Sequence, residues 1–363
     1  MRQPRSGQHR RAGPGNAVNG LITGSQLRLA VLARQQLLDR APPAMPVAEV
    51  VRRVCGLQTQ YAPTAYIGLW SRLAGFQRHV LTTALEQREV IQATLLRNTI
   101  HVVAAADYWP MRIAARDAMQ RWFLRRPDAP SVRTMRAAAA RVQRTIAGGG
   151  QLSRAELDSV AGAAGAAGVG MWVDLVRVPP SGTWERRRAD RFGLAEDWVG
   201  KAPELSVDDA RDRVVRSYLT GFGPASAKEI ASFCSMTVGD VRPCAERVAT
   251  RLFRADDGTE LFDLDDLPLP DADVAPPVRF IGNWEAILLV HARRALVIRE
   301  EDRSRIFTAK IPQSLPTFLV DGQVAGTWRF VEGTIEVEPW IELGARRRRQ
   351  VDAEAAALAE LFS

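Results

Sequence analysis

The hydrophobic residues near the start of this chain follow two different periods in close succession. In segment 47–58 they recur at intervals of three, four and seven positions: Val47, Val50, Val51, Val54 and Leu57. This spacing predicts a helix with one buried face. Segments 91–96 and 99–103 are instead β-prone and flank Arg97-Asn98, which predicts a hairpin. Short helices followed by a two-stranded ribbon predict a winged helix-turn-helix.

Helical and β-prone segments then alternate along the rest of the chain. Residues 107–147 and 208–218 have helical patterns, and segment 252–264 contains two β-prone runs suited to a wing. Residues 278–337 are β-rich, and a final helix is expected at 353–361. This order of elements predicts an α+β fold of three tandem winged helix-turn-helix units.

The boundaries of these units follow shifts in composition. Residues 1–24 are rich in Gly, Arg, Pro and Asn, so we expect a disordered basic tail there. The three winged-helix units are expected at residues 25–110, 111–210 and 211–345. Residues 346–363 combine a run of four arginines with the terminal helix.

The charge of the chain favours a polyanionic partner. Its 363 residues carry a net charge of +8, with a pI of about 10.1. Half of this net charge comes from the N-terminal tail, which has no acidic residue and four arginines: Arg2, Arg5, Arg10 and Arg11. The remaining chain is only mildly basic, so binding to DNA requires local clusters of cations.

Two arginine clusters are candidates for contacts with DNA phosphates. The first follows Trp184 and consists of Arg186, Arg187, Arg188 and Arg191. Its alternative role is a solvated charged face, with Glu185 and Asp190 as local partners. The second cluster lies in the third unit and consists of Arg293, Arg294, Arg303 and Arg305. Three acidic residues at 300–302 dilute its charge.

The reactive side chains argue against disulfides, metals and cofactors. The three cysteines and four histidines are widely spread and lack the spacing of zinc ligands. Only three lysines are available for a Schiff base: Lys201, Lys228 and Lys310. No signal-peptide core and no membrane-length apolar run is present. We therefore expect a cytoplasmic, nucleoid-associated monomer with no membrane partner, no metal and no cofactor.

Two side-chain amides stand out in a stretch that is otherwise apolar or small. Gln58 and Gln60 flank Thr59. An amide is neither a strong base nor a nucleophile at neutral pH, but it can hold a water molecule with directional hydrogen bonds. The alternative is that both amides cap the end of helix 47–58 and satisfy nearby backbone groups.

Several motifs, taken in their order, resemble those of one family. They are Leu-Ala-Arg-Gln-Gln-Leu-Leu-Asp-Arg at 32–40, Gly-Leu-Gln-Thr-Gln at 56–60, Leu-Arg-Asn-Thr-Ile-His-Val-Val at 96–103, Asp-Tyr at 107–108, Pro-Ser-Gly-Thr-Trp at 180–184, Gly-Pro-Ala at 223–225 and Val-Asp-Gly-Gln-Val-Ala-Gly-Thr-Trp at 320–328. Through them the chain resembles the bacterial winged-helix DNA glycosylases of the AlkZ/YcaQ type over about residues 25–345. Its Gln-x-Gln motif is similar to the AlkZ branch, since the other branch has Gln-x-Asp.

This resemblance implies a curved clamp of three winged helices around double-stranded DNA. It also implies excision of N7-alkylated purines, including bulky antibiotic adducts or interstrand crosslinks, in DNA repair and antibiotic self-resistance. Gln58 and Gln60 would then position water at C1′ of the sugar. A base alkylated at N7 leaves as a neutral group and needs no general acid. We therefore expect a monofunctional DNA glycosylase without lyase activity.

Three further residues are candidates for support of this site. His101 faces away from Ile100 and Val102 on its predicted strand, where it contacts phosphate or the lesion, or is a structural histidine bonded to backbone. Tyr61 is a candidate for stacking on a base or sugar, with core packing as the alternative. Asn98 is expected mainly to form the turn.

Two other classes of protein compete with a glycosylase. A noncatalytic winged-helix DNA-binding protein or transcription regulator needs neither Gln58 nor Gln60 at an inward-facing position. Such a regulator normally dimerises and binds a defined sequence. A nuclease is disfavoured because no clustered carboxylates offer a metal site.

Overall fold

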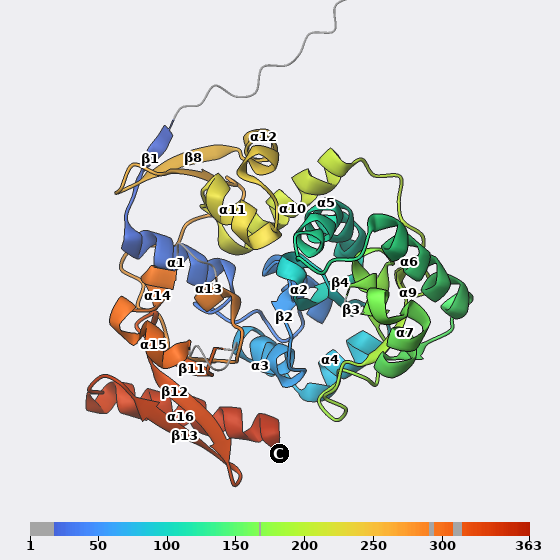
Figure 1. Ribbon diagram of the computed structural model, residues 1–363. Helices are drawn as coiled ribbons and strands as arrows, with labels where there is room; N and C mark the ends of the chain where they lie inside the picture. The colour runs from blue at the N-terminus through green and yellow to red at the C-terminus, as the bar shows by residue number, and fades with distance from the viewer. Residues whose placement is uncertain (1–17, 167, 290–293, 308–313) are drawn as a thin grey trace, which may run out of the picture.

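The computed structural model describes residues 18–166, 168–289, 294–307 and 314–363 (Figure 1). Helices and strands are mixed along the chain, so the predicted α+β fold class is confirmed. In Figure 1 the light-blue helices of residues 63–86 lie between the red C-terminal sheet and the green helices of the middle of the chain. Among the described residues, no helix is both long enough and apolar enough to cross a membrane.

The N-terminal elements surround the glutamine motif. They are α1 (Gly24–Arg34), α2 (Val47–Arg53), β2 (Leu57–Gln58), α3 (Pro63–Arg72), α4 (Arg78–Glu86), β3 (Val90–Thr94), the 3-10 turn η1 (Leu96–Asn98) and β4 (Ile100–Ala104). Strands β3 and β4 pair antiparallel around η1, so the hairpin predicted at Arg97-Asn98 is confirmed.

Strands from two parts of the chain share one sheet. The six strands have the order β2-β4-β3-β6-β7-β5, with β5 at Leu152–Ser153, β6 at Leu175–Arg177 and β7 at Arg191–Leu194. The helices of this part are α5 (Ala105–Leu124), α6 (Val132–Ile146), α7 (Arg154–Ala161), α8 (Ala163–Ala166), η2 (Val169–Met171) and α9 (Ala195–Val199). Because Gln92 of β3 pairs with Arg177 of β6, the first two expected units are joined by hydrogen bonds. The division into three winged-helix units stays a prediction.

The next elements include the expected wing. They are α10 (Val207–Phe222), α11 (Ala227–Cys234), α12 (Val238–Val248), β8 (Arg251–Ala255) and β9 (Glu260–Asp263). Strands β8 and β9 pair antiparallel, as predicted for segment 252–264. Strand β1 (Val18–Ile22) adds to β8 in parallel. The prediction of a tail is therefore wrong for residues 18–24, because Val18–Ile22 form this strand, Thr23 caps α1 and Gly24 begins it. Residues 1–17 lie outside the described part.

The C-terminal part combines a four-stranded sheet with a long helix. The sheet has the order β10 (Arg279–Ile281), β11 (Thr317–Val320), β12 (Gln323–Val331) and β13 (Thr334–Pro339), and α16 (Ala345–Phe362) packs against it. Helix α16 begins before residue 353, so the arginine run belongs to its first turns.

Short helices interrupt the segment that was expected to be β-rich. They are α13 (Ala286–Leu289), α14 (Arg294–Val297), η3 (Glu300–Asp302) and α15 (Arg303–Ile306). Ile287, Leu288 and Val297 are buried in the largest hydrophobic cluster. The segment contains β10 to β13 as expected, but residues 286–289 and 294–306 depart from the β-rich prediction because these apolar residues reach the core from single helical turns.

A buried ion pair fixes the helix that follows the glutamine motif to the C-terminal sheet. Arg72, at the end of α3, lies with its Nη2 atom 2.7 Å from an oxygen of Glu285, which follows β10. The same nitrogen donates to the side-chain carbonyl of Gln35. Removal of one partner from a buried ion pair of this kind strongly destabilises a protein, because the other charge is left buried without compensation. The contacts therefore hold α3 and the sheet in one arrangement.

Candidate active site

Gln58 lies in a short strand rather than in a helix. Helix α2 ends at Arg53, and Cys55 and Gly56 then have φ values of 61° and 82°. These left-handed residues turn the chain so that Gln58 pairs with His101 on β4. The prediction of a helix over 47–58 is wrong beyond Val54, because the apolar spacing continues through this turn into a strand. The alternative role of the two amides as helix caps is wrong for the same reason, but its second part is confirmed for Gln60, whose Oε1 atom satisfies the backbone N–H of Ile100.

The glycine at this turn is required by close contact with β4. A Cβ atom added to Gly56 would lie 3.0 Å from Cγ1 of Val103 and 3.2 Å from the carbonyl oxygen of Val102. Its positive φ also favours glycine over residues with a side chain. The turn therefore brings the backbone that precedes Gln58 directly against β4.

Gln60 is exposed, but its carbonyl oxygen is fixed. The Oε1 atom accepts a hydrogen bond from the backbone N–H of Ile100 at 2.7 Å. The backbone N–H of Thr59 donates to the carbonyl of Ile100 at 2.8 Å. The side chain of Gln60 thus continues the ladder between β2 and β4 beyond Gln58. This contact gives the exposed amide a defined position at the edge of the sheet.

Arg97 anchors the other glutamine. Its Nη2 atom donates to Oε1 of Gln58 at 2.8 Å, and its Nη1 atom donates to the carbonyl of Phe233 at 3.3 Å. Its backbone N–H donates to Oγ of Ser235 at 2.8 Å. Arg97 and Asn98 both have a φ of 55°, a region that costs energy for residues with side chains. This turn therefore ties the glutamine motif to the end of α11.

The guanidinium of Arg97 is a desolvated cation beside the motif. Among the described residues no carboxylate forms an ion pair with it; its neighbours are carbonyl oxygens, an imidazole and the ring of Phe233, 4.2 Å away. Burial lowers the pKa of Arg97 to about 10, so it stays charged at neutral pH. Sequence analysis placed this residue only in a turn, and its spacing gave no sign of this role.

His101 is a neutral, buried partner of Arg97. Only 1% of the residue is exposed, its Nδ1 atom lies 3.0 Å from the carbonyl of Thr99, and its Nε2 atom lies 3.5 Å from Nη2 of Arg97. Burial, together with the charge of Arg97, lowers the pKa of His101 to about 3. The ring therefore donates from Nδ1 and accepts at Nε2. Its position matches a structural histidine bonded to backbone, since a phosphate or lesion has no access to it.

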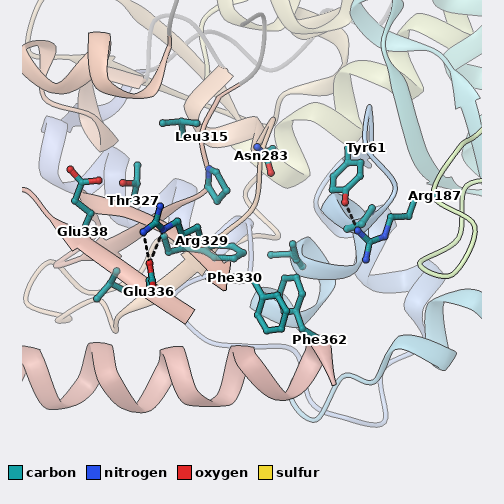
Figure 2. Close-up of a pocket in the computed structure, with 15 residues that line it drawn as sticks. Tyr61, Arg187, Asn283, Leu315, Thr327, Arg329, Phe330, Glu336, Glu338 and Phe362 are labelled. Carbon is teal, nitrogen blue, oxygen red and sulfur yellow. Dashed lines mark hydrogen bonds and ion pairs between the residues drawn. The ribbon is translucent and has the colours of Figure 1, made fainter. Parts of the chain in front are cut away.

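Tyr61 and Arg187 meet beside the motif (Figure 2). Tyr61 is 40% exposed, so core packing is not its role, and its hydroxyl accepts a hydrogen bond from Nη1 of Arg187 at 2.7 Å. Arg187 also lies over the rings of Tyr61 and Trp184. The first arginine cluster therefore reaches the segment that carries the glutamines, through the loop between β6 and β7.

The remaining candidates divide by exposure and pairing. Arg186 and Arg188 are exposed on the same loop, and Arg191 is half-buried at the start of β7. Arg303 pairs with Glu300, and Arg305 pairs with Asp302, so acids of their own segment neutralise them. Arg293 lies outside the described residues, and only the backbone of Arg294 is described.

Asn98 forms the turn as expected, and one of its atoms is buried without a partner. Its backbone N–H donates to the carbonyl of Leu95 at 3.2 Å. The side-chain oxygen of Asn98 is buried and has no hydrogen-bond partner among the described residues. A buried acceptor of this kind is costly unless water or a ligand satisfies it.

The arrangement can orient a polar molecule but offers little acid–base chemistry. Each glutamine carbonyl accepts one hydrogen bond from protein and has a second lone pair, and each amide has two N–H donors. Within the described ranges, no three His, Cys, Asp or Glu side chains are grouped to hold a metal ion. The site is therefore suited to positioning water rather than to proton transfer.

Comparison with solved structures finds a protein that shares this fold. Streptomyces sahachiroi DNA glycosylase AlkZ matches with a TM-score of 0.76 and 22% sequence identity, over 94% of this chain and 96% of that chain. At this identity the likeness shows a shared fold, which is that of a DNA glycosylase. A search of curated protein sequences finds no match.

A family model identifies the chain more closely. The model described as DNA glycosylase AlkZ-like matches residues 51–361, which include the glutamine motif, Arg97 and the C-terminal sheet. The chain belongs to the AlkZ-like DNA glycosylase family. The resemblance inferred from the sequence motifs is thereby confirmed, and DNA is the substrate that membership of this family implies.

Proposed function

We propose that this protein is a monofunctional glycosylase that removes N7-alkylated purines from double-stranded DNA. The observation that carries the proposal is the fixed pair of amides at the end of β2. Gln58 is held by Arg97, and Gln60 is held by the backbone of β4. Among the described residues, the two amide oxygens accept hydrogen bonds from a guanidinium and a backbone N–H rather than from an acid, which suits a leaving group that is already activated.

Gln58 and Gln60 orient the attacking water at C1′ of the sugar. The water oxygen forms a bond to C1′ as the C1′–N9 bond breaks, and the bonding electron pair goes to the base. This pair cancels the positive charge that alkylation placed on the purine, and the proton of the water passes to solvent. Orientation of the nucleophile and preorganised dipoles can together contribute several kcal/mol to such a reaction.

The lesion proposed here includes bulky antibiotic adducts and interstrand crosslinks as well as small alkyl groups. Exposed Arg186 and Arg188 are placed on a loop whose neighbour Arg187 contacts Tyr61, so they can hold phosphates next to the lesion. We propose that the chain acts as a monomer that curves around the duplex with three winged-helix units.

Release of the base from defined duplexes tests this function. One duplex carries N7-methylguanine and another carries a bulky N7-guanine adduct. We expect the wild type to produce abasic sites without strand cleavage. The double variant Gln58→Ala/Gln60→Ala should lose about 100- to 1,000-fold in rate, as when a positioned polar group is removed from an active site.

A matched control separates the motif from glutamine loss in general. Gln87 is exposed just after α4, and Gln87→Ala should leave the rate unchanged. If the wild type releases neither base but binds one duplex sequence tightly, the protein is a DNA-binding regulator. Strand cleavage that accompanies base release would contradict the monofunctional assignment.

A further inference from the structure

A pocket of about 710 Å³ lies between the start of α3, the loop joining β6 to β7, and the C-terminal sheet (Figure 2). Tyr61 and Arg187 line it from the first two segments. Thr327, Phe330 and Phe362 line it from β12 and the end of α16. Its volume lies in the range of sites that hold drug-sized molecules.

The pocket begins at the residue that follows the glutamine motif in the chain, since Tyr61 is one of its lining residues. Tyr61 directly follows Gln60, so their Cα atoms are about 3.8 Å apart. The hydrogen bond between Tyr61 and Arg187 fixes the wall on this side. On the other side, the buried pair of Arg72 and Glu285 holds α3 against the segment that follows β10. The pocket is therefore a preformed space next to the segment that carries the glutamines.

Aromatic side chains give the pocket apolar walls. Phe330 and Phe362 stack on each other with ring centroids 4.3 Å apart and planes inclined by 13°. Phe330 is nevertheless 38% exposed. The indole N–H of Trp328 is already bonded to the carbonyls of Ile281 and Thr317, so its ring offers only apolar contact. These surfaces suit a flat group that stacks on rings.

The charges at the rim argue against a DNA phosphate as the occupant. Glu336 and Glu338 both line the pocket, and Glu336 is paired with Arg329. Arg187 on the opposite side donates to Tyr61. The two carboxylates balance the two guanidiniums of Arg187 and Arg329, so the lining has no excess of positive charge to attract a phosphate. The occupant is therefore uncharged, planar and largely apolar.

We propose that this pocket binds the planar substituent of a bulky N7-alkylpurine, while the purine itself stays at the glutamines. This inference rests on the proposed function and adds a second binding site for the same lesion. A methyl group fills only a small part of the pocket, but a fused-ring substituent can contact Phe330 and Tyr61 together. The pocket thus favours bulky aromatic adducts over N7-methylguanine.

The test compares base release from two lesions under single-turnover conditions. The enzyme is in excess over the DNA, but its concentration stays below the one that saturates DNA binding. The measured quantity is the ratio of base release from an N7-guanine adduct with a fused-ring substituent to release from N7-methylguanine. Phe330→Ala removes one wall, and Thr327→Trp fills the space. Loss of an aromatic stacking partner should lower this ratio about 5- to 150-fold. Trp122→Ala removes an exposed aromatic side chain of α5 and should leave the ratio at the wild-type value.

The outcomes separate this inference from the function on which it rests. A lower ratio in both pocket variants, with no change in Trp122→Ala, supports the pocket. An unchanged ratio in Phe330→Ala and Thr327→Trp overturns it while the glycosylase function stands. Equal losses on both lesions also overturn it, because they show that the pocket holds the purine itself. If the wild type releases neither base, the proposed function fails first and the pocket assignment fails with it.

Discussion

Replacement of Arg97 by methionine should reduce base release much more than it reduces stability. Methionine has a similar length and can keep the contact with the ring of Phe233. It cannot donate to Gln58, which accepts from Arg97 at 2.8 Å. The variant therefore removes the hydrogen bond that holds the side chain of Gln58, without opening a large cavity.

The expected size of the effect follows from this one contact. A hydrogen bond from a charged donor contributes about 1.5–3 kcal/mol. If all of it serves to hold Gln58 in the transition state, its loss slows the reaction by about 10- to 150-fold. The change in the free energy of unfolding should be smaller than this change in the activation barrier. Loss of the hydrogen bond to the carbonyl of Phe233 is offset by removal of a desolvated charge.

The assay is single-turnover release of N7-methylguanine, together with urea unfolding of each variant. Arg88 supplies a matched control, since it also has a positive φ, donates to a backbone carbonyl and lies over a tryptophan, Trp198. Arg88→Met should keep the wild-type rate. A folded Arg97→Met variant with the wild-type rate would refute the idea that Gln58 must be anchored.

Three further outcomes are expected. The pKa of His101 is lowered to about 3, so its contribution to stability is fully present above the ordinary pKa of about 6.5 and is lost as pH falls toward 3. The loss amounts to at most about 1.4 kcal/mol per pH unit. The unfolding free energy, measured with urea at each pH, should fall less steeply in His101→Asn than in the wild type, whereas the exposed control His79→Gln should follow the wild type. Gly56→Ala should destabilise the protein by about 1–2 kcal/mol more than the control Gly75→Ala. Gly75 also has a positive φ, but a Cβ atom added to it would have no neighbour closer than 3.9 Å. Equal unfolding free energies for the two variants would contradict the close contact between Gly56 and β4. Arg186→Ala/Arg188→Ala should reduce the salt dependence of duplex binding, measured by fluorescence anisotropy, by up to about 1.8 in the slope of log K against log salt, and an unchanged slope would place both side chains in solvent.

Local patterns predicted the elements whose signals lie within a few residues. The hairpin of β3 and β4 and the wing of β8 and β9 follow from short β-prone runs around turns. Each of these features depends on contacts between near neighbours, which is why the sequence alone indicates them.

The elements that sequence patterns missed depend on distant partners. Arg97 contacts Gln58 and Phe233, which are 39 and 136 positions away. Strand β1 forms only by pairing with β8, far along the chain. The end of α2 was missed because apolar spacing continues across the left-handed turn at Cys55 and Gly56. Local periodicity does not contain this information.

The protonation states of the two side chains next to Gln58 bear on the class of lesion proposed for this site. His101 stays neutral above a pKa of about 3, and Arg97 stays charged below a pKa of about 10. In the part of the chain that the structure describes, neither neighbour of this amide gains or loses a proton near neutral pH. Neither of these two neighbours is therefore suited to protonate a neutral base and make it a better leaving group. The proposed function requires no such proton, because an N7-alkylated purine brings its own positive charge and leaves the two amides only the task of placing the water.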